Sequence, residues 1–257
     1  MSGALAGIRV LELGQVLAGP FAGAIFADLG AEVVKLERIE GGDDARKMGP
    51  AFRHGDALNF HIFNRGKKSV AIDLNSQAGK DAFERLAAAS DIFIHNMSAA
   101  SGRGEQAWVN NLNLDVLGLV RAQEVIAPAM EAGGGGAIVC LSSIAAQEEF
   151  AGPGSFGPMK AAMTAYANNL SQSLAPKGIR VNIVSPGPVF FEGGNWDTIK
   201  THMTAFYEAT VAKMPLKRLG DPREIANAIA FLASPAASLI TGANLVIDGG
   251  YTKRIKF

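Results

Sequence analysis

The 257-residue sequence is poor in several features that would each point to a particular class of protein. Its single cysteine, Cys140, excludes an intramolecular disulfide, fits a reducing compartment, and is expected to be a packed core thiol. Because 24 basic residues balance 24 acidic ones, no charge excess indicates a nucleic-acid or membrane partner. The start MSGALAGIRV lacks a basic segment followed by an apolar one, and no apolar run reaches membrane-spanning length. We therefore expect a soluble, cytoplasmic chain.

The sequence does have the composition and the pattern of a globular α/β protein. Apolar residues make up 48% of it and charged residues 19%, which permits one large core. Short apolar runs that predict strands alternate with helical stretches, and they cover 8–13, 32–37, 69–74, 91–94 and 137–141. Continuous apolar strands separated by helices are typical of a parallel sheet that is buried on both faces. We predict a doubly wound, mainly parallel, Rossmann-like sheet.

The stretch 136–160 carries the strongest functional signal. A buried strand ends at Ser143, on the edge where open α/β sheets place their chemistry, and Phe156 and Lys160 open the next helix. This spacing resembles the catalytic core of the short-chain dehydrogenase/reductase (SDR) family. The resemblance implies that Ser143 polarises a carbonyl and that Lys160 lowers a neighbouring pKa and holds the cofactor ribose. At the position of Phe156 that family has a tyrosine, which donates a proton to the substrate; here the hydroxyl is missing.

The SDR resemblance runs from about Asp91 to the C-terminus and implies further site residues. Asn96, in HNMS, is the residue kept from the family motif N-N-A-G. Asp115 stands where the family has an asparagine whose main chain holds a water for proton relay. Pro186 and Gly187 preserve a turn that lies against the nicotinamide in that family.

The first 90 residues resemble a different family. LAGIRVLELGQVLAGPFAGAIFADLGAEVVKLER, GGDDARKMGP and NRGKKSVAIDL are similar to the N-terminal segment of the class III CoA-transferases (the CaiB/BaiF family). This resemblance implies that Gln15 lies near a thioester, and that Arg38 and the basic residues Arg65, Lys67 and Lys68 lie near the CoA nucleotide. The aspartate that forms the acyl anhydride in that family lies beyond the similar segment. CoA binding is therefore implied more strongly than complete transferase chemistry.

The first strand–helix turn bears on the choice of cofactor. Aligned on Gly14, the SDR pattern T-G-x-x-x-G-x-G becomes Leu13, Gly14, Ala18 and Pro20. Ala18 adds a methyl group where a pyrophosphate needs room, and Pro20 removes a backbone donor. We predict that NAD(P) binds weakly or not at all, while CoA binding stays open. No metal site is predicted, because the histidines lack partners at ligand spacing.

The similar segments, 1–90 and 91–257, join at a strand without a Pro/Ser-rich linker. Because both families build right-handed β-α-β units, the resemblances imply one domain over 1–257 with strand order 3-2-1-4-5-6-7. SDR proteins associate through the helices led here by Asp115 and Met159 and through the last strand, so we expect a homodimer or homotetramer. The stretch 40–66 predicts a long, partly irregular connection.

Three functions remain open on the sequence, all with a small-molecule ligand. The first is SDR chemistry on a small carbonyl, hydroxyl or acyl substrate, which Phe156 and the altered turn oppose. The second is a cofactor-independent hydrolase or lyase in which Ser143 and Lys160 act as nucleophile and base. The third is an acyl-CoA-binding protein without catalysis. The fold cannot decide among them.

Overall fold

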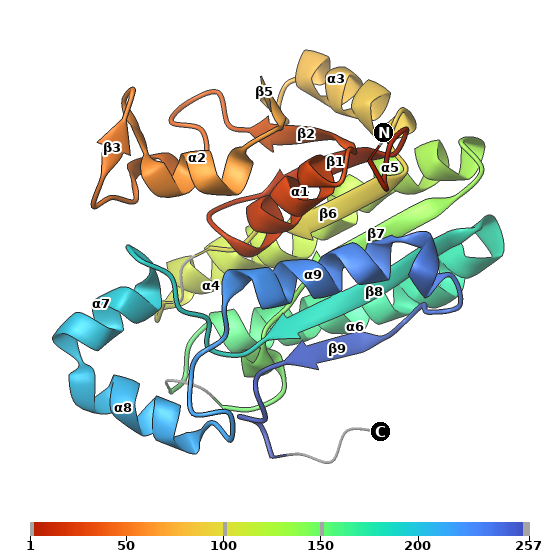
Figure 1. Cartoon of the computed structure of the whole chain (residues 1–257). Coiled ribbons are helices and arrows are strands. Elements are labelled where there is room, and N and C mark those ends of the chain that lie inside the picture. Colours follow the sequence, from red (N-terminus) through yellow and green to blue (C-terminus); the bar gives the residue numbers. More distant parts are fainter. Residues whose placement is uncertain (1–2, 100–101, 150–151, 254–257) are drawn as a thin grey trace.

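A parallel sheet of seven strands runs through the computed structural model, which describes residues 3–99, 102–149 and 152–253 (Figure 1). The sheet consists of β1 (Arg9–Gly14), β2 (Glu32–Glu37), β5 (Lys68–Ala71), β6 (Ile92–Asn96), β7 (Gly136–Leu141), β8 (Ile179–Pro186) and β9 (Asn244–Ile247). Their order across the sheet is β5-β2-β1-β6-β7-β8-β9. Counted along the chain this is 3-2-1-4-5-6-7, so the predicted Rossmann-like fold is confirmed.

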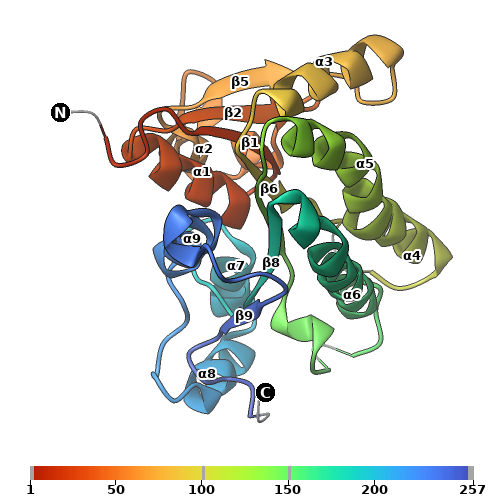
Figure 2. The ribbon, with the colours of Figure 1, turned by 90° about the vertical axis from the view of Figure 1, so that its right-hand side faces the viewer.

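Helices cover both faces of this sheet. Figure 2 shows α1 (Ala18–Asp28) and α9 (Pro222–Ala233) on one side, and α3 (Gln77–Ala88), α5 (Leu117–Ala132) and α6 (Phe156–Leu174) on the other. Successive residues of a strand point to opposite faces, so Val10 packs into the core under α1 and α9, and Leu11 packs into the core under α3, α5 and α6. This two-sided burial explains why the strands appear in the sequence as continuous apolar runs.

The single thiol sits at the centre of the sheet. Cys140, on β7, is fully buried and unpaired, which confirms the predicted core thiol. Burial raises the pKa of this thiol to about 12. No helix formed by residues 3–99, 102–149 and 152–253 is both long enough and apolar enough to span a membrane.

The remaining elements are short. They are the strands β3 (Phe52–Arg53) and β4 (Asp56–Ala57), the helices α2 (Leu58–Asn64), α4 (Glu105–Asn111), α7 (Asn195–His202) and α8 (Thr204–Lys213), the 3-10 turns η1 (Asp44–Lys47), η3 (Ile144–Ala146), η4 (Ala175–Lys177) and η5 (Pro235–Ala237), and the π-helical turn η2 (Leu112–Val116). The predicted irregular connection at 40–66 therefore contains a small hairpin and α2. The sequence pattern missed α2 because the helix has only seven residues, of which Phe60 and Phe63 are buried.

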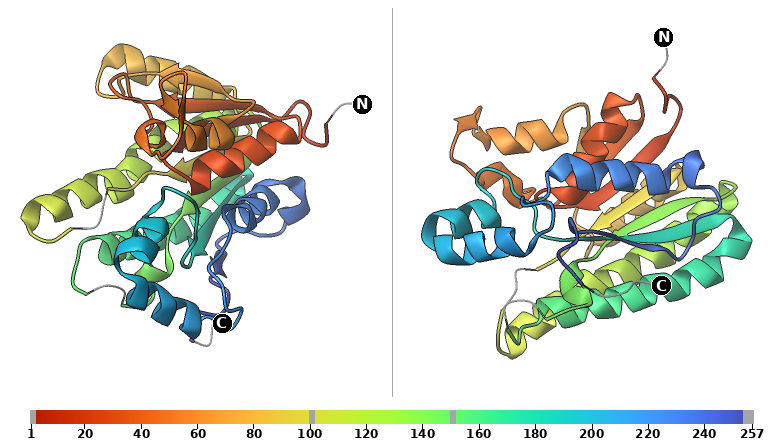
Figure 3. Two further views of the ribbon diagram at one scale, coloured as in Figure 1. Left: turned by 60° about the vertical axis from the view of Figure 1, so that its left-hand side comes forward. Right: turned by 60° about the horizontal axis from the view of Figure 1, so that its bottom comes forward.

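Residues 40–66, here called the arm, contact the loop that precedes α7. The side-chain amide of Asn59 donates to the carbonyl of Glu192 at 2.7 Å, and the rings of Phe63 and Phe191 meet edge to face at 5.9 Å. Gly193 has a φ of +74°, and a Cβ there would lie 2.1 Å from the carbonyl oxygen of Gly49. Figure 3 shows the arm and the α7–α8 pair beyond the same end of the sheet. Distant parts of the chain thus enclose the carboxyl ends of the strands.

Candidate active site

A cleft of about 1530 Å³ opens at the carboxyl ends of the strands. Its walls are the first strand–helix turn, the end of β6, the loop after β7, the start of α6, the turn after β8 and the α7–α8 pair. Six of the predicted site residues line it: Gln15, Asn96, Ser143, Phe156, Pro186 and Gly187. Among the described residues, the other four predicted ones, Gly14, Arg38, Asp115 and Lys160, lie outside its lining.

Ser143 presents a hydroxyl group to the cleft. Its backbone is extended (φ −162°, ψ 156°), and its Oγ accepts the N–H of Ala145 at 3.2 Å, which caps η3. A hydroxyl that accepts one bond still has its own hydrogen to donate, so Ser143 can polarise a ligand oxygen. The preceding residue, Ser142, is buried instead and bonds to Thr164 at 2.7 Å.

Lys160 is turned away from the cleft and paired with Asp115. Its Nζ lies 2.9 Å from Asp115 Oδ1, with side-chain exposures of 4% and 0%, and it donates to the carbonyl of Leu141 at 3.0 Å. The same Nζ lies 5.8 Å from the centre of the Phe156 ring. The charge of Lys160 is therefore balanced inside the protein, and its aromatic neighbour offers no proton.

A chain of polar side chains behind the cleft holds Asp115 in place. Asp115 Oδ2 accepts from the amide of Asn111 at 2.9 Å, and Ser155 donates to Asn111 Oδ1 at 2.6 Å. The backbone at Asp115 belongs to the π-helical turn η2, a departure from regular helix that is frequent at functional sites. Burial, with help from the charge of Lys160, lowers the pKa of His95 to about 3, so this fully buried imidazole is neutral.

In the first strand–helix turn, a carboxylate of the protein accepts a hydrogen bond from the backbone. The N–H of Val16 donates to Asp43 Oδ1 at 2.9 Å, and the N–H of Gln15 donates to the carbonyl of Asn96 at 3.2 Å. Val16 has a φ of 67°, a conformation that costs a β-branched residue about 1–2 kcal/mol. Pro20, the third residue of α1, contributes no N–H. The turn therefore has few amides left for an anionic ligand.

Asp43 is fixed there by a buried network of four charges. Lys35 Nζ lies 2.8 Å from Asp43 and 3.0 Å from Glu12, and Lys67 Nζ lies 2.6 Å from Glu12; none of the four side chains is more than 2% exposed. Burial opposes the charge on Lys35, but Glu12 and Asp43 raise its pKa, whereas burial lowers the pKa of Lys67 to about 8. A Cβ on Gly23 would lie 2.1 Å from Glu12 Oε2, so glycine is required on α1 beside the network. This network could not be predicted from the residues around each charge, because its members are distant in the sequence.

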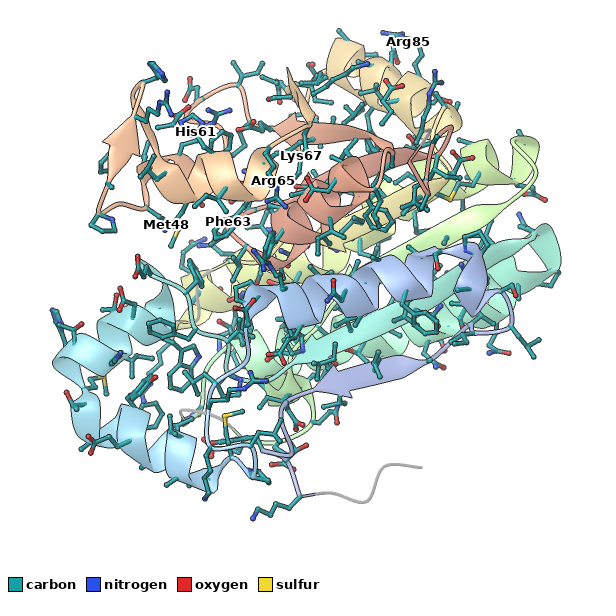
Figure 4. All side chains as sticks on the ribbon, in the orientation of Figure 1. Met48, His61, Phe63, Arg65, Lys67 and Arg85 are labelled. Carbon is teal, nitrogen blue, oxygen red and sulfur yellow. The ribbon has the colours of Figure 1, made fainter. Side chains whose placement is uncertain are left out.

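The cations that the CoA-transferase resemblance places near a nucleotide all have partners within the protein. Arg65 and Lys67 lie beside α1, where Arg65 pairs with Asp28 and Lys67 donates to the carbonyl of Pro20 (Figure 4). The pairs are Arg38–Asp44, Arg65–Asp28, Lys67–Glu12 and Lys68–Glu32. Within the described part of the chain, Asp44 is the only one of these paired residues that lines the cleft.

Comparison with protein families identifies both parts of the chain. The family model described as enoyl-(acyl carrier protein) reductase, an SDR model, matches residues 64–252. The chain belongs to the SDR family. The model of CoA-transferase family III matches residues 5–103, so the two similarities overlap around β5 and β6.

Relatives of this SDR protein fall into the same two groups. Isoepoxydon dehydrogenase patN of Aspergillus clavatus is 38% identical over 211 residues, which cover 81% of this chain and 75% of that protein. Dehydrogenase/reductase SDR family member 4 of Oryctolagus cuniculus is 33% identical, covering 74% of this chain and 70% of the relative. Succinate–glutarate CoA-transferase of Agrobacterium fabrum is 47% identical over 98 residues, which are 36% of this chain and 24% of that enzyme.

Solved structures extend the SDR fold over the whole chain. A short-chain dehydrogenase/reductase family protein superposes with a TM-score of 0.75 at 28% identity, covering 96% of this chain and 98% of that one. L-sorbose reductase of Gluconobacter frateurii, at 24% identity, has a TM-score of 0.79 and covers 99% and 100%. The N-terminal segment therefore adopts the SDR arrangement although its sequence resembles a CoA-transferase.

Proposed function

We propose that this SDR-family protein binds a small carbonyl compound over Ser143 and transfers no hydride. One observation carries the proposal: at both ends of the cleft, a buried carboxylate of the protein engages a group that nicotinamide chemistry requires. Asp43 accepts the first-turn amide of Val16, and Asp115 pairs with Lys160.

The first turn does not fit the pyrophosphate of NAD(P). A pyrophosphate is held by free amides at a helix N-terminus, close to the backbone. Here the amide of Val16 is donated to Asp43, Pro20 has no amide, and Ala18 lines the cleft with a methyl group. A nicotinamide cofactor therefore has no part in the proposed function.

At the opposite end of the cleft, Phe156 occupies the position at which the SDR family has its proton-donating tyrosine. General acid catalysis contributes roughly two to four orders of magnitude to such reactions. The Phe156 ring lines the cleft where the family has tyrosine, and the ammonium of Lys160 is directed to Asp115 and to the carbonyl of Leu141. Neither residue is arranged to move a proton to or from a ligand.

The chemistry that the site supports is polarisation of a carbonyl by hydrogen bonding. Ser143 donates its hydrogen to the ligand oxygen, and Asn96 and Gln15 form a polar wall beside it. Attack by Ser143 would need a base to take its proton. The contacts of Lys160, with Asp115 and with the carbonyls of Leu141 and Met97, direct its protons elsewhere. Binding and polarisation are therefore favoured over a Ser–Lys nucleophile.

A redox enzyme is the second candidate, and the similarity to patN over most of its length favours it. Calorimetric titration with NADH, NADPH and CoA, before and after Phe156→Tyr, separates the two. We expect no nicotinamide binding in the micromolar range and no hydride transfer in either protein, because the tyrosine restores an acid but not the cofactor site. Low-micromolar binding of NADH or NADPH, followed by hydride transfer in the Phe156→Tyr variant, would establish the redox function instead.

A further inference from the structure

We propose that the ligand of the cleft is an uncharged, ring-containing carbonyl compound, with its oxygen on Ser143 and its ring against Trp196. The inference rests on the proposed function and specifies the ligand of the same site. It follows from two independent properties of the cleft wall, the sign of its charges and the position of its aromatic rings.

The charges of the wall are of one sign. Within the described residues, three carboxylates line the cleft, those of Asp44, Glu148 and Glu149, and no Lys, Arg or His lines it. Asp44 is paired with Arg38, which lies outside the lining, so the negative charge of the wall comes mainly from Glu148 and Glu149. Lys160 is enclosed behind the wall and is neutralised by its buried partner Asp115. A concave site lined by one sign of charge concentrates its field and disfavours ligands of that sign. Phosphate-bearing ligands such as CoA, and simple carboxylates, are therefore excluded in favour of neutral ones.

The lid formed by α7 and α8 supplies a flat aromatic face. The rings of Trp196 and Phe206 are nearly parallel, with an interplanar angle of 6° and centroids 6.0 Å apart, and both line the cleft. Ile199 on α7 and Met203, which joins the two helices, extend this apolar surface. Aromatic side chains bind rings through burial and through offset stacking. A planar or alicyclic ring system matches this face better than a flexible acyl chain does.

The opposite wall combines the hydroxyl of Ser143 and the amides of Gln15 and Asn96 with apolar side chains. Ser143 can donate one hydrogen, and the side chains of Ile144 and Leu17 line the cleft with it. Few polar groups in a largely apolar pocket fix the orientation of a ligand. The arm also contributes, because Asn59 holds the loop before α7 and so fixes the position of the aromatic face.

A matched pair of probes tests the sign of the charge. The ketone 2-acetonaphthone and the anion 2-naphthoate share a ring system and differ in charge, and acetyl-CoA is a polyanionic acyl compound. We expect the ketone to bind and the carboxylate to bind roughly tenfold more weakly, with no measurable binding of acetyl-CoA. Equal affinity for ketone and carboxylate, or tighter binding of acetyl-CoA, would overturn the inference, and so would failure of the ketone to bind.

The two tryptophans of the chain provide the reporter and its control. Trp108 is 40% exposed on α4 and does not line the cleft, so Trp108→Ala leaves Trp196 as the single emitter. We expect the ketone to quench this variant with unchanged affinity, and Trp196→Ala to bind it roughly tenfold more weakly by calorimetry. Equal affinity in both variants would contradict contact with Trp196.

Charge-removing variants complete the test. The double change Glu148→Gln and Glu149→Gln should raise the affinity for naphthoate severalfold and leave the ketone unaffected, whereas Glu105→Gln, exposed on α4, should change neither. An unaltered naphthoate affinity would contradict the claim that Glu148 and Glu149 repel anionic ligands.

If acetyl-CoA binds and no hydride moves, the ligand class is wrong and the proposed function stands. If NADPH binds and reduces the ketone, the proposed function itself is wrong.

Discussion

The N-terminal and C-terminal parts of this protein both bury charges behind one cleft, but they do so differently. In the N-terminal part, Glu12, Lys35, Asp43 and Lys67 form an alternating network that also satisfies the carbonyls of the first turn and of α1. In the C-terminal part a single buried pair joins η2 to α6. The network binds backbone groups of the first turn, whereas the pair engages one side chain that does not line the cleft. Similar chemistry thus engages a backbone amide at one end of the cleft and the ammonium of Lys160 at the other.

Breaking the network should have the largest effect. Glu12→Gln leaves Lys35 and Lys67 without their shared carboxylate in a dry interior, which typically costs about 3–5 kcal/mol. We expect a loss of that size in the free energy of unfolding, measured by denaturant titration. Glu32→Gln, at an exposed pair with Lys68, serves as the control and should change stability far less. Equal effects of the two changes would mean that the network contributes little.

Breaking the C-terminal pair should have a smaller effect. Asp115→Asn keeps the hydrogen bond from Asn111 but leaves Lys160 uncompensated, so we expect a loss of about 2 kcal/mol. Adding Lys160→Met should recover most of this loss, because no buried charge then remains unpaired. The double-mutant cycle measures the coupling energy directly. Additive losses would show that the two side chains do not stabilise each other.

Acid should weaken the fold through His95. Its pKa is lowered from 6.5 to about 3 by burial, so between these values the unfolded chain binds a proton that the folded chain does not. Stability therefore falls as the pH drops from 6.5 toward 3, by up to about 1.4 kcal/mol per unit from this residue. His95→Asn should flatten the pH profile of the free energy of unfolding, and His61→Asn, at an exposed site, should not. Identical profiles would assign the acid sensitivity to other groups.

Loosening the arm should have the smallest energetic effect. Asn59→Ala removes the bond to the carbonyl of Glu192, so we expect faster hydrogen exchange in α7 and roughly threefold weaker binding of the ketone. Asn75→Ala removes a side-chain hydrogen bond to Asp73 within an exposed turn outside the arm, and should alter neither. Unchanged exchange in α7 would show that the arm does not hold the lid.

The assembly of the protein stays a prediction. Trp108, Leu112 and Leu114 are each about 40% exposed around η2, and Leu245 is 38% exposed on the edge strand β9. These are the surfaces through which we expect a homodimer or homotetramer to form. Light scattering at micromolar concentration should give the mass of two or four chains, and the mass of one chain would refute the expectation.

The sequence predicted the sheet well because its strands are buried on both faces and therefore appear as apolar runs. The bounds of β2, 32–37, came out as predicted although the strand contains Lys35 and Glu37. The SDR resemblance also pointed to Ser143, Asn96 and the Pro186–Gly187 turn, which all line the cleft because they lie at the carboxyl ends of strands; their roles stay a prediction. These parts depend on local pattern alone.

The buried charges could not be predicted, because their partners are distant in the sequence. Lys67 meets Glu12 across 55 positions and Lys35 meets it across 23, and each residue taken alone has the pattern of a solvated charge. The SDR resemblance placed Asp115 and Lys160 in the site, but the pairing of the two became visible only in three dimensions. Asn111 and Ser155 were missed for the same reason.

The buried thiol has a practical consequence. Burial raises the pKa of Cys140 to about 12, so thiolate is scarce at neutral pH and thiol-alkylating reagents should leave Cys140 unreacted in the native protein. Labelling requires β7 to leave the centre of the sheet, which is an event of global unfolding. The rate at which the Cys140 thiol is alkylated therefore reports on the opening of the entire fold. It can be measured without introducing a probe into the sequence.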